Sequence, residues 1–175
     1  RCFPNHKRLQ ARINLGLSPD KTVLLFPSAS GHQRKGLPFI VKSLEGLTNI
    51  ELAIAGKSNK LESPSIVPLG YQTDMEKVYN AVDYTILASN YEPFGLVGIE
   101  SVLCGTPVIL AENIGCTEVL SRSACTTFNL EDRDSLKQIF QSLLPPKHRT
   151  SSVDIDYNFS ARDQALSIIK MIYSL

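Results

Sequence analysis

Two glutamates, Glu92 and Glu100, stand eight positions apart in the segment SNYEPFGLVGIESVLCGTPVI, which covers residues 89–109. Every residue between them is apolar, Gly or Pro. A charged group that is buried without a partner costs several kcal/mol. We therefore expect the two carboxylates to meet a ligand.

The elements around the two glutamates indicate which ligand. Residues 83–89 predict a strand and residues 94–104 a helix, and ligands of open parallel sheets bind outside the carboxyl ends of the strands. The helix start, residues 94–97, offers backbone N–H groups and a positive dipole end to a phosphate. Glu100 leans back toward the same end, where its carboxylate can accept hydrogen bonds from the diol of a ribose. One ligand with a diphosphate between a ribose and a hexose accounts for both glutamates.

Short apolar strands alternate with amphipathic segments along the chain. We expect strands at 22–29, 50–56, 66–71, 83–89, 106–112 and 125–130, and helices at 37–47, 74–82, 94–104, 116–121, 133–144 and 160–175. The polar segment 56–66 is predicted to be a mobile loop. This alternation predicts an α/β fold with a Rossmann-like, doubly wound, mostly parallel sheet and helices on both faces.

Composition excludes several other classes of protein. The 175 residues suit one domain, 1–175, and a net charge of +1 offers no general field for nucleic acid. No apolar run approaches the roughly 20 residues of a membrane span, and the polar, basic first residues are not a signal peptide. The cysteines, Cys2, Cys104, Cys116 and Cys125, form no CxxC pair, which favours reduced thiols in the cytoplasm over a disulfide framework or a metal site.

The segment EPFGLVGIE followed by SVLCGTPVI resembles the E-x7-E signature of retaining GT-B glycosyltransferases, family four in the carbohydrate-enzyme classification. QRKGLPFIVKSL resembles the lysine-glycine segment that follows the first strand of that family's C-terminal domain. VYNAVDYTILAS, AENIGCTEVL and LEDRDSLKQIF resemble the stretches before and after the glutamate loop. The resemblance covers roughly residues 20–145.

The resemblance implies roles for particular residues. Glu92 would lie at the donor hexose and take part in catalysis, Glu100 would bind the ribose hydroxyls, and Lys35 would neutralise the diphosphate as it leaves. Amides between the glutamates would contact donor sugar or phosphate: Phe94, Gly95 and Leu96. The family uses no cofactor and usually no metal, because the nucleotide-sugar is itself a substrate.

Two positions are less well defined. Family members carry an arginine several residues before the lysine, whereas this chain has FPSAS there, so Arg34 or His32 would have to supply the second cation. Tyr71 follows a predicted strand and is a candidate to stack on the nucleotide base, with a rim or buried tyrosine as the alternative reading.

We therefore expect the C-terminal, donor-binding half of a retaining hexosyltransferase that transfers a hexose from an NDP-sugar to an acceptor hydroxyl, for example in polysaccharide or glycoconjugate synthesis. The N-terminal acceptor domain would be its partner and is absent from this chain, so the isolated domain should be inactive. The terminal helix 160–175 would pack on that missing half, through which peripheral membrane association stays open. An NDP-sugar epimerase of GT-B architecture and a non-catalytic interaction domain remain alternatives.

Overall fold

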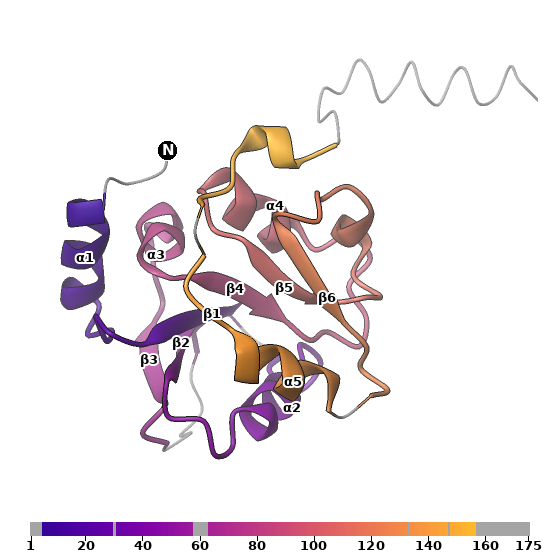
Figure 1. Ribbon diagram of the computed structural model, residues 1–175, viewed down its shortest axis with the longest axis horizontal. Helices are drawn as coiled ribbons and strands as arrows, with labels where there is room; N and C mark the ends of the chain where they lie inside the picture. Colours follow the sequence, from indigo (N-terminus) through magenta and orange to yellow (C-terminus); the bar gives the residue numbers. More distant parts are fainter. Residues whose placement is uncertain (1–4, 30, 58–62, 133, 147, 157–175) are drawn as a thin grey trace, which may run out of the picture.

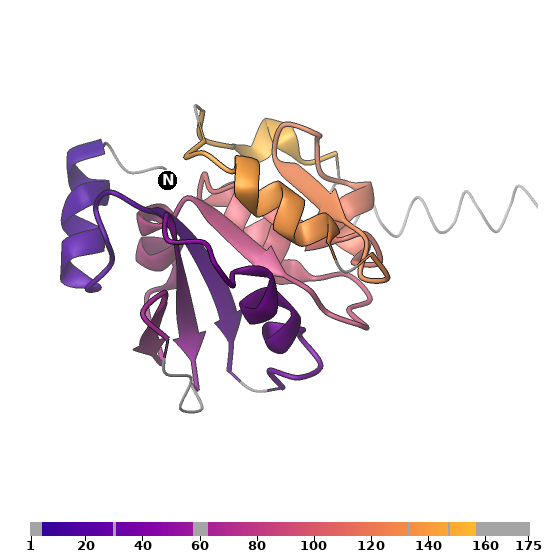
Figure 2. The same ribbon diagram turned by 60° about the horizontal axis from the view of Figure 1, so that its bottom comes forward.

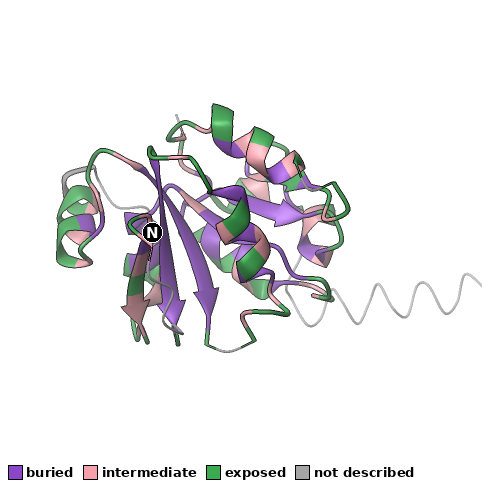
Figure 3. Ribbon diagram, turned by 90° about the horizontal axis from the view of Figure 1, so that it is seen from below, coloured by how far each residue is buried: buried purple, intermediate pink, exposed green. Residues whose placement is uncertain are grey.

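Six parallel strands form one sheet in the order β3-β2-β1-β4-β5-β6 (Figure 1). The computed structural model describes residues 5–29, 31–57, 63–132, 134–146 and 148–156. The strands are β1 (Thr22–Ser28), β2 (Ile50–Gly56), β3 (Ile66–Gly70), β4 (Tyr84–Leu87), β5 (Val108–Ala111) and β6 (Cys125–Phe128). All residues of β1, β2 and β5 are buried, as expected for strands covered on both faces (Figure 3).

Helices cover both faces of the sheet. α2 and α5 lie together on one face, whereas α1, α3 and α4 lie on the other (Figures 1 and 2). The helices are α1 (Asn5–Asn14), α2 (Leu37–Ser43), α3 (Met75–Ala81), α4 (Leu96–Leu103) and α5 (Ser135–Ser142), with short 3₁₀ turns η1 (Gly115–Glu118) and η2 (Ser152–Asp154). The predicted Rossmann-like α/β fold is confirmed.

The predicted elements agree with the structure apart from their ends and three differences. The helix expected at 116–121 is the 3₁₀ turn η1, one residue earlier and shorter. Neither helix α1 nor the 3₁₀ turn η2 was predicted. The expected helix 160–175, and residues 58–62 of the expected loop 56–66, lie outside the described residues.

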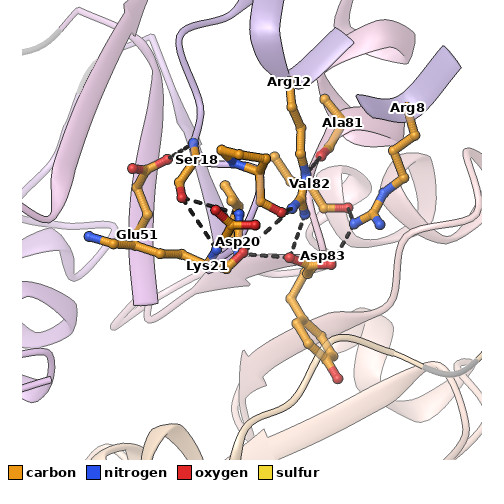
Figure 4. Close-up of polar contacts among 12 residues, drawn as sticks. Arg8, Arg12, Ser18, Asp20, Lys21, Glu51, Ala81, Val82 and Asp83 are labelled. Carbon is orange, nitrogen blue, oxygen red and sulfur yellow. Dashed lines mark hydrogen bonds and ion pairs between the residues drawn. The ribbon is translucent and has the colours of Figure 1, made fainter. Parts of the chain in front are cut away.

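A buried ion cluster attaches α1 to the sheet (Figure 4). Asp83, which precedes β4 and is fully buried, accepts hydrogen bonds from Arg8 and Arg12 of α1. Its Oδ2 lies 2.5 Å from Arg12 Nη2 and also accepts the backbone N–H of Val23 at 2.8 Å. Arg12 Nε donates to the carbonyl of Ala81 at 2.7 Å. The cluster joins α1 to the start of two adjacent strands.

The direction in which the chain moves across the sheet reverses between β1 and β4. From β1 it proceeds outward to β2 and β3, and from β4 outward to β5 and β6. The carboxyl ends of two parallel strands at such a reversal leave a crevice between the loops that follow them, which is where ligands bind in this architecture. The loops that follow β1 and β4 are therefore the place to look for a site.

Candidate functional site

The loop after β1 presses against the end of β4. Gly36, at the end of this loop, has a φ of 75°, and a Cβ built there would lie 2.0 Å from the carbonyl oxygen of Ala88. Only glycine fits this approach and this backbone conformation. The N–H of Asn90 donates to the carbonyl of Arg34 at 3.1 Å. The loops after β1 and β4 are thus joined where the strand order of the sheet reverses.

Arg34 and Glu92 lie on facing sides of this junction. The guanidinium Nη1 of Arg34 donates to the carbonyl oxygen of Tyr91 at 3.0 Å and lies 3.9 Å from Glu92 Oε2. Lys35 is the next residue, is partly buried, and donates its backbone N–H to Gly31 at 2.9 Å. The structure therefore brings Arg34, one of the predicted cations, close to the first glutamate, and Lys35 follows it in the same loop.

His32 lies in the same loop but is directed at the core. Its ring packs edge-on against Phe26 of β1 with centroids 6.0 Å apart. Its Nε2 is buried without a hydrogen-bond partner among the described residues, and so is the hydroxyl of Ser89 just past β4. Because buried polar atoms are nearly always paired, both atoms are candidates to meet a ligand or a water. Sequence reasoning did not single out Ser89.

A third loop, between β5 and η1, braces the glutamate loop. Asn113 Nδ2 donates to the carbonyls of Ser89 and Asn90 at 3.1 and 2.9 Å. The N–H of Cys116 donates to the carbonyl of Phe94 at 2.7 Å. A Cβ on Gly115 would lie 2.1 Å from the carbonyl of Pro93, so the loops touch backbone to backbone. The role of Asn113 was missed because its partners lie more than 20 residues away in sequence.

Helix α4 begins at Leu96, two residues later than predicted, with Gly95 as its N-cap in the left-handed conformation at φ 83°. A Cβ on Gly95 would lie 3.4 Å from Glu92 Cγ, so the first glutamate packs against this helix start. Phe94 is partly buried against the core, whereas Leu96 is 61% exposed. Glu92 thus lies directly at the start of α4, beside residues 94–96.

Glu100 stands one turn further along α4. It is exposed, and its Oε2 accepts a hydrogen bond from the hydroxyl of Tyr79 of α3 at 3.0 Å. Burial, followed by the nearby charge of Glu100, raises the pKa of Tyr79 well above its ordinary value. Tyr79 stays a neutral phenol that donates to the carboxylate. Sequence reasoning missed it because a tyrosine in VYNAV fits an apolar helix position.

Tyr71 follows β3 at the same edge of the sheet. Its side chain is exposed, and its hydroxyl donates to the carbonyl of Ala29, the residue after β1, at 3.4 Å. This contact places Tyr71 beside the first loop of the site.

Three of the four cysteines lie among the described residues. Cys104, Cys116 and Cys125 form no disulfide bonds, and burial raises the pKa of Cys116 to about 12 and that of Cys125 to about 11. Among the described residues, no group of three or more His, Cys, Asp or Glu is placed to hold a metal ion. None of the described helices has the length and apolar composition of a membrane span.

The fold and the joined loops define a Rossmann-like α/β domain of the kind found in GT-B glycosyltransferase structures. Residues 21–145 match the family described as Glycosyl transferases group 1, and the chain belongs to this family. It is 42% identical over 135 residues to a probable transglycosylase of Burkholderia thailandensis, a match that covers 77% of this chain and 37% of that protein.

Other relatives are less similar in sequence, and this chain again matches only part of each of them. The chain is 30% identical over 122 residues to a D-inositol 3-phosphate glycosyltransferase of Mycobacterium marinum, covering 59% of this chain and 26% of the relative. Sucrose-phosphate synthase from Thermosynechococcus elongatus superposes with a TM-score of 0.71 at 21% identity, over 99% of this chain and 52% of that one. HepE from Anabaena, solved in complex with UDP and glucose, gives a TM-score of 0.69 at 17% identity, over 99% and 53%. The chain thus spans about half of these structures.

Proposed function

We propose that this chain is the donor-binding half of a retaining GT-B glycosyltransferase of family four, and that it binds an NDP-sugar at the loops after β1 and β4. The observation that carries the proposal is the junction of Arg34, Glu92 and the start of α4 at the point where the sheet reverses. HepE, of the same fold, was solved with UDP and glucose, which supports a nucleotide-sugar as the ligand class.

The diphosphate would lie between the basic loop and the helix start. Lys35 would neutralise its charge, and Arg34, which the geometry favours over His32 as the second cation, would exchange part of its contact with Glu92 for a phosphate oxygen. Exposed ion pairs stabilise a protein by about 0–1 kcal/mol, so this exchange costs little. Amides of residues 94–96 would contact the phosphates or the sugar, with Glu92 at the hexose.

The ribose would lie at Glu100 and the base near Tyr71. Glu100 would accept hydrogen bonds from the ribose hydroxyls chiefly through Oε1, because Tyr79 already donates to Oε2. Tyr71 is exposed beside Ala29, and its ring would stack on the base.

The reaction we propose transfers a hexose with retention of configuration. The bond between the anomeric carbon and the phosphate oxygen breaks, and the acceptor oxygen forms the new bond on the same face of the sugar. The acceptor proton passes to the leaving phosphate. Glu92 orients the hexose and stabilises positive charge at its anomeric region, while Lys35 and the helix start stabilise the leaving diphosphate. No metal or other cofactor enters this scheme.

The acceptor would bind an N-terminal domain that this chain does not contain, in keeping with the chain's spanning about half of its structural neighbours. We propose the cytoplasm as the location, because the free cysteines suit a reducing compartment. Polysaccharide or glycoconjugate synthesis is the broad process that a hexosyltransferase of this kind would serve.

One observation favours a second candidate, a domain that binds the donor without turnover. The stretch FPSAS has no arginine where the family carries one. Intact protein that binds an NDP-sugar and neither transfers nor hydrolyses it would support this alternative.

The test is calorimetric titration of the chain with UDP, GDP and ADP, for the unmodified protein and for Glu100→Ala. We expect at least one nucleotide to bind. Glu100→Ala should lose about 2–3 kcal/mol of binding free energy, because hydrogen bonds to a charged acceptor disappear.

The matched control is Glu45→Ala, an exposed glutamate just past the far end of α2, which should leave the affinity unchanged. Absence of heat with all three nucleotides contradicts donor binding. Equal affinities for Glu100→Ala and unmodified protein would remove Glu100 from the site.

A further inference from the structure

The second glutamate of the site has a fixed partner that no part of the proposed function requires. Tyr79 is 2% exposed, yet its hydroxyl reaches the exposed carboxylate of Glu100 at 3.0 Å. The two residues belong to different helices, 21 positions apart. A tyrosine can satisfy its hydroxyl with a backbone carbonyl, as the half-buried Tyr84 does with Leu144 at 2.9 Å. The hydroxyl of Tyr79 instead donates to Glu100, a side chain of the candidate site.

Hydrogen bonds hold both ends of this contact in place. The carbonyl of Tyr79 accepts from the hydroxyl of Thr106 at 2.5 Å. The hydroxyl of Ser101, beside Glu100, lies 2.8 Å from both Thr85 Oγ1 and the carbonyl of Thr106. Ser101 and Thr106 are fully buried. Thr106, just before β5, therefore anchors both the backbone of Tyr79 and the helical turn that carries Glu100.

The chemistry of the contact is directional. A carboxylate accepts hydrogen bonds and cannot donate them, and Tyr79 remains a neutral donor because burial and the charge of Glu100 raise its pKa. Its bond to Oε2 selects one orientation of a long, exposed side chain that would otherwise occupy several. Oε1 and the second lone pair of Oε2 stay available.

We infer that Tyr79 is a positioning residue that holds the Glu100 carboxylate in the orientation in which it accepts the ribose hydroxyls of a nucleoside diphosphate. The inference rests on the proposed function. It assigns Tyr79 an effect that depends on the ribose hydroxyls themselves, because Tyr79 acts on the ligand only through Glu100.

The experiment compares Tyr79→Phe with the unmodified chain by titration with two ligands: the best-binding nucleoside diphosphate and its 2′,3′-dideoxy analogue. Tyr79→Phe should weaken binding of the ribonucleotide about three- to tenfold, the effect of one hydrogen bond. Binding of the dideoxy analogue should change less than about twofold, since that ligand has no hydroxyls for Glu100. Comparing the two ligands within one variant separates an effect on the ribose contact from a general loss of stability, which would weaken both ligands alike.

Tyr84→Phe is the matched control, because it deletes a hydroxyl that bonds a backbone carbonyl away from the site, and it should leave both affinities unchanged. Equal ribonucleotide affinities for Tyr79→Phe and unmodified protein overturn the inference. An equal loss for both ligands also overturns it, because it marks a purely structural role. Unmodified protein that binds neither ligand defeats the proposed function, and this inference with it.

Discussion

Glu92 and Glu100 are held in different ways in the free chain. Glu92 is near Arg34, an ion pair of 3.9 Å between partly exposed groups that a ligand can displace at little cost. Glu100 has a hydrogen bond from a buried tyrosine. In the proposed site, the first glutamate would therefore adapt to the sugar, whereas the second would already be oriented for the ribose.

The sequence pattern predicts that the two glutamates and the basic loop belong to a site, but it does not predict the residues that hold them in place. The spacing of Glu92 and Glu100 in an apolar segment is visible without a structure. Tyr79, Ser89 and Asn113 act through hydrogen bonds or buried atoms that depend on tertiary placement, and no local pattern marks them.

Cys116 fills the contact between η1 and α4, where its sulfur would lie 2.7 Å from a Cβ on Gly98. Burial raises the pKa of Cys116 to about 12 and of Cys125 to about 11, so both stay protonated thiols at pH 8. Since the thiolate is the nucleophile, iodoacetamide should alkylate both slowly in the native chain and rapidly in denaturant. Peptide mass spectrometry over a time course measures this, and fast native labelling of either thiol would contradict it.

At the scale of elements, the alternation of strands and helices was sufficient to predict the sheet and most of its helices. Helix α1 was not predicted because few of its residues are apolar on the face toward the domain, and its attachment is ionic. Arg8 and Arg12 bind Asp83, some 70 residues later in the chain. Such a tertiary ion pair leaves no periodic signal in sequence.

Asp83→Asn should therefore destabilise the chain strongly. It leaves Arg12, 5% exposed, without its charged partner, and breaking a buried ion pair from one side costs about 3–5 kcal/mol. Urea unfolding followed by circular dichroism measures the change. Asp20→Asn, an exposed carboxylate in the same region, should change the free energy of unfolding by less than about 0.5 kcal/mol. A similar small change for Asp83→Asn would show that the cluster is not needed to hold α1.

At the scale of the whole molecule, the chain covers about half the length of the solved structures that share its fold. The site lies at the carboxyl ends of the central strands β1 and β4, on the edge of the sheet where all six parallel strands end. In the two-domain arrangement that we propose, this edge faces the acceptor half. In that arrangement the donor loops would belong to this chain, and the acceptor side of the cleft would belong to the other half.

We accordingly expect the isolated chain to bind a nucleoside diphosphate but to transfer no hexose. Incubation with the matching NDP-sugar and candidate acceptors, followed by chromatography of the products, checks this. A longer protein that includes the preceding half should restore transfer. Transfer by the chain alone at the rate of the longer protein would place the acceptor site within these 175 residues.

Backbone hydrogen bonds join the three loops that meet at the site. The N–H of Asn90 donates to the carbonyl of Arg34, and the N–H of Cys116 donates to the carbonyl of Phe94. Bonds of this type do not depend on which side chains the loops carry. Exposed neighbours such as Tyr91 and Leu96 can therefore be exchanged in evolution, or in the laboratory, while the scaffold beneath them keeps its shape. In the proposed site, single substitutions at these positions would change the sugar preference without any rebuilding of the backbone.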